Sequence, residues 1–163
     1  MHITMREYAE SDLLEITEIW NEIVRTGVAF PQFEELTKDE ALVFFSGQSF
    51  VGVAENKETG EILGLYILRP NSVGRCAHIA NASYAVKLAV RGRKIGEKLI
   101  THSIAKGKEL DFRLLQFNAV VISNKNAIHL YEKLGFVRIG TVPDGFLMKD
   151  GTFEDIILFY HKL

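Results

Sequence analysis

Apolar positions along the chain switch between the two-residue period of a strand and the 3.6-residue period of a helix. The strand pattern, or a short apolar run, predicts strands at residues 2–8, 49–56, 61–70, 78–90, 113–121, 136–143 and 152–163. The helical period predicts helices at residues 11–26, 37–45, 94–110 and 124–134. The predicted order is β-α-α-β-β-β-α-β-α-β-β. An antiparallel run before a β-α-β crossover gives a mixed, twisted sheet flanked by helices, the α/β (α+β) class.

Polar residues mark the ends of these elements. Ser11 is the expected N-cap of the first helix, and Gly27 is its expected stop. Thr37 and Glu40 stand at the spacing of a capping box at the start of the second helix. The polar run 57–60 ends in glycine, which predicts a hairpin between the strands on either side.

The composition is that of an ordinary globular protein. Of the 163 residues, 47% are hydrophobic and 25% are charged, so we expect one domain, residues 1–163, whose core needs no metal. Cys76 is the only cysteine, the N-terminus is polar, and no 18-residue apolar run occurs, which together predict a cytoplasmic protein. A net charge of -2 gives no general attraction for polyanions, so neither nucleic acid nor a membrane is an expected partner.

A basic segment containing two glycines joins the strand 78–90 to the helix 94–110. It reads Arg91-Gly92-Arg93-Lys94-Ile95-Gly96. The free N–H groups and the positive dipole at a helix start attract anions, the glycines permit a close backbone approach, and the cations add charge. The segment therefore predicts a phosphate or diphosphate site, or else a solvated basic loop. Neither the P-loop nor the dinucleotide-binding glycine pattern is present.

A second segment, residues 124–136, reads NKNAIHLYEKLGF. The two segments together resemble motifs A and B of the GCN5-related N-acetyltransferase (GNAT) superfamily. The motif B pattern N-x-x-A-x-x-L-Y-x-x-x-G-F matches at every specified position. The motif A pattern [QR]-x-x-G-x-[GA] aligns with residues 91–96, where Lys94 departs from the usual glycine. The resemblance covers nearly the whole chain and implies the GNAT fold, a mixed, twisted sheet of about seven strands flanked by four helices.

The resemblance implies acetyl-CoA as the donor and direct attack of an amine on its thioester. Residues 91–96 would hold the diphosphate of the cofactor. Backbone groups of the preceding strand, at Val86, Lys87 and Leu88, would contact the pantetheine arm and the acetyl group. Among these we expect the Leu88 amide to bind the carbonyl oxygen as the oxyanion donor.

Tyr131 stands at the tyrosine position of motif B. A phenol with an ordinary pKa of about 10 is chemically suited to donate a proton to a departing thiolate, so Tyr131 is the expected general acid. The alternative is a core aromatic on the apolar face of its helix. Asn124 is expected as an N-cap, as a cofactor contact, or as both, and Asn126 as a further cofactor contact.

The expected acceptor contacts are Asn81, Asn118 and Arg25. Several family members that acetylate amino-acid-like substrates carry a glutamate about where Asn81 stands. The sequence around Asn81 and Asn118 resembles fungal acetyltransferases of proline-like imino acids, in which matching asparagines hold the substrate. An amide bonds a carboxylate or an ammonium group but is not a base. Arg25 precedes the loop 27–30, which covers the acceptor in this fold, and is a candidate partner for a substrate carboxylate.

The general base is not evident from the sequence. His78 and Tyr84 lie on the same predicted strand as Asn81 but at odd spacing, so each is expected on the opposite face and is more readily explained as structural. Glu22 is expected on the solvated face of the first helix.

We therefore expect an acetyl-CoA-dependent N-acetyltransferase that acts on a small amino-acid-like amine. One alternative is a module that binds acyl-CoA without turnover. Another is a protein-lysine or N-terminal acetyltransferase, for which the acidic pairs 34–35 and 39–40 would supply a groove. A homodimer stays open. Four phenylalanines fit the core, an apolar acceptor pocket or a dimer contact: Phe30, Phe33, Phe44 and Phe45.

Overall fold

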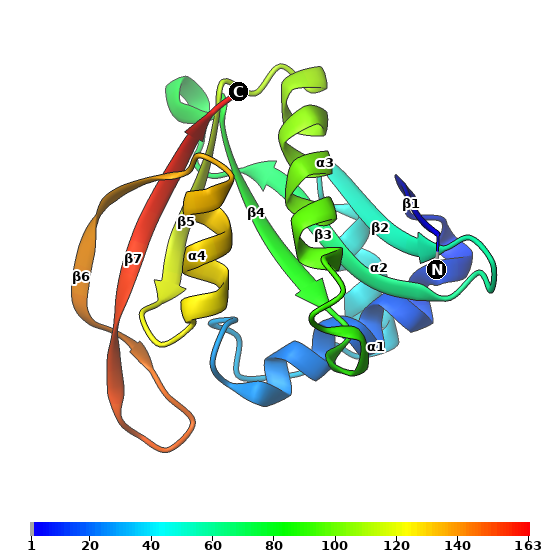
Figure 1. Ribbon diagram of the computed structural model, residues 1–163, viewed down its shortest axis with the longest axis horizontal. Coiled ribbons are helices and arrows are strands. Elements are labelled where there is room, and N and C mark those ends of the chain that lie inside the picture. The colour runs from blue at the N-terminus through cyan, green and yellow to red at the C-terminus, as the bar shows by residue number, and fades with distance from the viewer. Residues whose placement is uncertain (1) are drawn as a thin grey trace.

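The computed structural model describes residues 2–163, which form a mixed seven-stranded sheet with helices on both faces (Figure 1). The strands are β1 (Ile3–Glu7), β2 (Phe50–Asn56), β3 (Ile62–Pro70), β4 (Ile79–Val86), β5 (Leu114–Val121), β6 (Val137–Leu147) and β7 (Phe153–Lys162). The helices are α1 (Leu13–Thr26), α2 (Lys38–Ser46), α3 (Ile95–Glu109) and α4 (Lys125–Lys133). The strand order is β1-β2-β3-β4-β5-β7-β6. The predicted fold class and element order are confirmed.

Two hydrophobic cores lie on opposite faces of the sheet because the central strands are buried on both sides. One core contains Leu99 of α3 and Ile128 of α4, packed on strand residues such as Phe117. The other contains Trp20 of α1, packed with Phe45 of α2 and the strands beneath them. Each helix pair therefore covers one face, and the sheet separates the two pairs (Figure 1).

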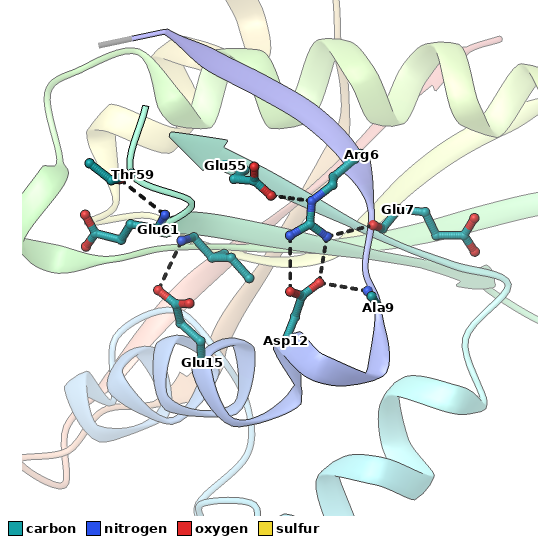
Figure 2. A network of polar contacts seen from close by, with 9 residues as sticks. Arg6, Glu7, Ala9, Asp12, Glu15, Glu55, Thr59 and Glu61 are labelled. Atoms are coloured by element: carbon teal, nitrogen blue, oxygen red, sulfur yellow. Dashed lines mark hydrogen bonds and ion pairs between the residues drawn. The ribbon is translucent and has the colours of Figure 1, made fainter. Parts of the chain in front are cut away.

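The start of α1 differs from the prediction. A 3-10 turn precedes the helix, and the residue that closes it is Asp12, not Ser11, because the Asp12 carboxylate accepts the Ala9 N–H at 2.7 Å. Arg6 donates to the same carboxylate at 2.6 Å and also pairs with Glu55 (Figure 2). A serine hydroxyl has no charge to offer the arginine. The Arg6 hydrogen bond lowers the pKa of Asp12 and ties β1 and β2 to the helix start.

The other predicted helix ends are confirmed. Gly27 ends α1 with a φ of 64°, in the left-handed region that glycine adopts without strain. At the start of α2 the Thr37 hydroxyl accepts the Glu40 N–H at 3.3 Å, and the Glu40 carboxylate accepts the Thr37 N–H at 2.8 Å. The antiparallel pairing of β2 with β3 confirms the hairpin predicted at 57–60.

The strand predicted at 78–90 is shorter in the structure. β4 ends at Val86, and a 3-10 turn at Leu88–Val90 leads into the basic segment. The apolar pattern continues past the strand because Val90 packs into the core beside α3 rather than in the sheet. β4 and β5 pair in parallel only over Ile79–Asn81 and then diverge (Figure 1). This divergence opens the sheet at its centre.

The last hairpin also differs from the prediction. β6 extends beyond the predicted 136–143 to Leu147 and includes Pro143. A proline is tolerated there because β6 is the edge strand of the sheet. The register between β6 and β7 shifts twice, at Arg138/Gly140 and at Val142/Phe146, where residues on one strand are left without a partner.

Candidate active site

A cavity of about 850 Å³ occupies the opening between β4 and β5. Its walls come from the segment 28–32 after α1, from β3, β4 and β5, from the start of α3 and from α4. It therefore reaches from the basic segment at 91–96, through the gap in the sheet, to residues 28–32, the cover segment, which overlaps the loop 27–30 expected to cover the acceptor. A long donor can enter from one end and a small acceptor from the other.

Backbone alternation along β4 determines which amides face the opening. The Lys87 N–H bonds the Leu63 carbonyl at 3.0 Å, on the β3 side. Because successive residues of a strand direct their backbone groups to opposite neighbours, the amides of Tyr84 and Val86 face β5, beyond the point where pairing with β5 stops. The Val86 amide therefore faces the opening, whereas the Lys87 amide is bonded to β3.

The side chain of Lys87 also turns away from the cavity. Its Nζ donates to Glu61 at 2.7 Å and to Glu15 at 3.4 Å. Glu15 lies in the first turn of α1 and Glu61 directly precedes β3; both acids are labelled in Figure 2. Lys87 does not line the cavity. Its expected contact with the cofactor is not supported, because both its backbone and its side chain bind other parts of the chain.

The Leu88 amide, the expected oxyanion donor, is not free in the structure. It donates to the carboxylate of Glu22 on α1 at 2.9 Å. Leu88 also lies outside β4, in the 3-10 turn that follows it, and does not line the cavity. These contacts do not support Leu88 as the oxyanion donor, whereas the amides of Tyr84 and Val86 face the opening. Glu22 fastens the end of β4 to α1 rather than facing solvent alone.

The basic segment has the conformation of an anion-binding loop. Gly92 has a φ of 80°, and a Cβ there would meet no other atom within 4 Å. Lys94 has a φ of 60° and is followed at once by α3, whose first N–H groups point toward the loop. Arg91 and Arg93 are exposed, and neither forms an ion pair within residues 2–163. Buried Ile95 anchors the segment in the core.

The remaining contacts predicted for the cofactor come from the start of α3 and of α4. Gly96 lies in the first turn of α3 and lines the cavity. The Asn124 side chain accepts the Ala127 N–H at 3.4 Å, which confirms its role as N-cap of α4. Asn124 and exposed Asn126 both line the cavity.

Tyr131 projects from α4 into an aromatic cluster at the cavity. Its ring centroid lies 4.5 Å from that of Phe117, 5.8 Å from that of Phe159 and 6.5 Å from that of Tyr84. Burial raises the pKa of Tyr131 well above its ordinary value, so the phenol keeps its proton at any physiological pH. Within residues 2–163 its hydroxyl has no hydrogen-bond partner, so the hydroxyl is available to donate to a bound ligand.

Neither residue considered as a base fits that role. The Tyr84 hydroxyl forms a hydrogen bond with Ser103 Oγ on α3 at 2.7 Å, and burial raises the pKa of Tyr84. Exposed His78 precedes β4 and does not line the cavity. Tyr84 lines the cavity, but its hydroxyl is bonded to α3, and neither contact pattern supports a base.

Asn81 and Asn118 both line the cavity, from β4 and β5. The Asn81 side-chain amide donates to the Gln116 carbonyl at 2.9 Å. The Asn118 amide donates to Asn71 Oδ1 at 2.6 Å, and its carbonyl accepts from the Gln116 side chain at 3.1 Å. Each asparagine carries two N–H donors and two acceptor positions, so both keep hydrogen-bonding capacity for an acceptor molecule.

The arginine predicted for the acceptor is not the one at the cavity. Arg25 pairs with Glu18 and, at 2.6 Å, with Glu35, and it does not line the cavity. These contacts do not support its predicted role, because two acids already pair with it. Arg69 at the end of β3 does line the cavity. In the sequence Arg69 stands out only as a cation at the end of the apolar run 62–68, and the sequence analysis did not select it as an acceptor contact.

The phenylalanines of the first third divide among several roles. Phe30 lines the cavity and packs on Trp20, with a centroid distance of 4.3 Å. Phe44 and Phe45 also pack on Trp20, so they belong to the core. Phe33 is 81% exposed.

The chain matches the model of the acetyltransferase (GNAT) family over residues 13–136. It is 28% identical to the N-acetyltransferase aca1 of Schizosaccharomyces pombe over 169 residues, covering 93% of this chain and 81% of that protein. A GCN5-related N-acetyltransferase from Kribbella flavida has 33% identity and a TM-score of 0.91, covering 99% of this chain and 98% of that one. A phosphinothricin acetyltransferase from Sinorhizobium meliloti, solved with acetyl-CoA, has the same fold, with 24% identity, a TM-score of 0.92, and coverage of 100% and 89%.

The fold, the open sheet and the anion-binding loop are those of an acyl-CoA-dependent transferase, and the chain belongs to the GNAT acetyltransferase family. It is an N-acetyltransferase whose cosubstrate is acetyl-CoA. The cradle, by which we mean residues 91–96, fits that molecule. Gly92 leaves room for a diphosphate, and Arg91 and Arg93, neither of which forms an ion pair within residues 2–163, stand on either side of it. No helix within residues 2–163 is long and apolar enough to cross a membrane.

Proposed function

We propose that the acceptor is a small amino-acid-like amine. The observation that carries this proposal is the polarity of one half of the cavity, the half farther from the basic segment 91–96, which we call the acceptor half. It is lined by the amides of Asn81 and Asn118 and by the hydroxyl of Ser83. The one acid that lines the cavity within the described residues is Glu97, which sits at the start of α3 and pairs with Lys133 at 2.8 Å. Neutral hydrogen-bonding groups suit a zwitterion, whose two ends need partners of both kinds.

Acetyl-CoA supplies a thioester whose carbonyl carbon accepts the amine and whose sulfur leaves as a thiol. The backbone amides of Tyr84 and Val86 are our proposed donors to the carbonyl oxygen, because they face the opening in the sheet. The protonated phenol of Tyr131 is our proposed proton donor toward the sulfur. Among the described residues no histidine or unpaired carboxylate lines the cavity, so in this scheme the ammonium proton leaves through water, or the amine binds in its neutral form.

Glu97, the one acid that lines the cavity within the described residues, is already paired with Lys133, which weighs against a cationic acceptor such as a lysine side chain or a polyamine. The acidic pairs considered for a peptide groove serve other purposes, since Glu35 pairs with Arg25 and Glu40 caps α2. None of the four acids at 34–35 and 39–40 lines the cavity. The retained Tyr131 favours turnover over a module that only binds acyl-CoA.

The test is release of free thiol from acetyl-CoA with a panel of amines: free amino and imino acids, their amides, polyamines, arylamines and lysine peptides. We expect free amino or imino acids to have the highest kcat/KM. Asn81→Ala should lower that value about 5- to 150-fold, because a substrate group is left unpaired. Ser72→Ala, an exposed change outside the cavity, is the control. Faster turnover of polyamines or peptides would contradict the proposal.

We also propose a cytoplasmic location and a homodimer. A cytoplasmic location is supported by the exposed, unpaired Cys76, which suits a reducing compartment. A homodimer is supported by the exposed apolar side chains of the edge strand β6, among them Val137 and Ile139. Cell fractionation and sedimentation at several concentrations test them.

A further inference from the structure

Arg69 is a half-buried cation with no partner in the described part of the chain. It stands next to the last residue of β3 and lines the cavity between β4 and β5. Within residues 2–163 its guanidinium forms no salt bridge or hydrogen bond, although charged side chains are seldom withdrawn from water unpaired. A guanidinium that lines a cavity and is not paired with an acid of the described chain can bind an anionic group there.

The position of Arg69 assigns it to the acceptor half of the cavity. It lies directly opposite Asn81 in the antiparallel register of β3 and β4, so the two side chains share one face of the sheet. Leu65 and Ile67, which alternate with Arg69 along β3, pack into the core beneath α1 and α2. Arg69 therefore faces the same side as the cover segment 28–32.

The anion that Arg69 meets is not the diphosphate of the donor. The basic segment at 91–96 begins beyond the far end of β4, whereas Asn81 lies near the start of that strand. From Asn81 to Val86 the strand alone spans roughly 16 Å, at about 3.3 Å per residue. The two cationic sites thus lie at opposite ends of the cavity, one for each substrate.

A guanidinium matches a carboxylate better than amides do. It carries a permanent positive charge and two parallel N–H donors that bond both oxygens of a carboxylate at once. Asn81 and Asn118 bond such a group without neutralising it. Arg25 is less suited to this role because it is already paired with Glu18 and Glu35.

We propose that Arg69 binds the acidic group of the acceptor and so makes a free carboxylate, or an equivalent anion, a requirement for efficient acetylation. This inference rests on the proposed function, because it specifies which end of the amino-acid-like acceptor is recognised and by which residue. Arg69 is a binding residue in this scheme and takes no part in the proton transfers. Asn81, beside it, is left to bond the amine end.

The experiment compares one free amino or imino acid with its carboxamide, which has nearly the same shape but no negative charge. Values of kcat/KM are measured for the wild type, for Arg69→Met and for Arg75→Met, in which an exposed arginine outside the cavity is replaced in the same way. We expect Arg69→Met to lose about 10- to 100-fold on the acid and to leave the carboxamide nearly unchanged. Arg75→Met should keep the wild-type preference.

The melting-temperature rise on adding CoA shows that each variant folds and binds the donor. If Arg69→Met does not fold, Arg69→Lys serves instead, because it keeps the charge but loses the paired donors, and it should reduce the preference in part. An acid preference that survives loss of the guanidinium overturns the inference while the proposed function stands. Preference of the wild type for polyamines or peptides overturns both.

Discussion

Replacing Lys94 with glycine separates backbone strain from charge at the start of α3. Lys94 adopts a φ of 60° and a ψ of 18°, in the left-handed region that glycine enters freely and other residues rarely adopt. No side-chain hydrogen bond caps the helix there. The lysine therefore carries a conformational cost that the usual glycine of the motif avoids, and it brings a cation to the cradle in exchange.

The expected sizes follow from these two effects. A non-glycine residue in the left-handed region costs about 1–2 kcal/mol, while a new glycine costs about 0.4–1 kcal/mol through the unfolded chain. Lys94→Gly should therefore stabilise the protein without ligand by about 0.5–1 kcal/mol. For a chain of this length that is a rise in Tm of about 1–4 °C. Loss of one exposed cation should weaken CoA binding by about 1 kcal/mol or less, up to about fivefold in Kd.

The assay is thermal unfolding without ligand, combined with titration calorimetry of CoA, for Lys94→Gly and Lys94→Ala. Alanine removes the charge but keeps the strain, so it should weaken CoA binding equally without raising the Tm. If glycine and alanine give the same Tm, the strain assigned to Lys94 is wrong. If both bind CoA as tightly as the wild type, Lys94 does not contact the diphosphate.

Three other changes test separate parts of the site. Tyr131→Phe keeps the ring packed on Phe117 but removes the proton donor, so kcat should fall about 100-fold with CoA affinity retained, and an unchanged kcat would assign Tyr131 to packing alone. Gly96→Asp has room for its Cβ, since the nearest atom is 3.6 Å away, so the unliganded Tm should hold while the CoA-induced rise disappears. Burial lowers the pKa of His102 below its ordinary value of about 6.5, so on acidification the unfolded chain takes up that proton first and the protein should lose stability below about pH 6.5. In thermal melts at several pH values, His102→Gln should reduce this dependence of Tm on pH. An equal dependence in the variant and the wild type would show that His102 is not its source.

The fold and the donor side could be predicted because they depend on local patterns. Hydrophobic periodicity determined the element order, and the cap of α2 came from two residues three positions apart. The cradle at 91–96 is likewise one continuous segment, so its residue types, charge and helix start were visible together. The end of β4 was not predictable in this way, because Val90 continues the apolar pattern while packing outside the sheet.

The choice of Leu88 as oxyanion donor depended on the direction in which successive backbone amides point, which the sequence does not record. Choosing among Val86, Lys87 and Leu88 requires knowing which amides point toward β3, and that depends on a register that no local pattern records. The partner of the Leu88 amide, Glu22, lies 66 positions away along the chain. Neither fact leaves a signal at the residue itself.

The acceptor side depends on which charges remain unpaired once the chain has folded. The sequence analysis considered Arg25 and not Arg69, but folding brings Glu18 and Glu35 to Arg25, whereas within residues 2–163 no acid pairs with Arg69. An arginine held by acids can bind a substrate carboxylate only by giving up those partners, whereas an unpartnered one loses nothing but water. We therefore propose Arg69, which has no acidic partner within residues 2–163, as the arginine that binds the substrate carboxylate. The same reasoning separates Leu88, whose amide is occupied by Glu22, from Val86, whose amide faces the opening.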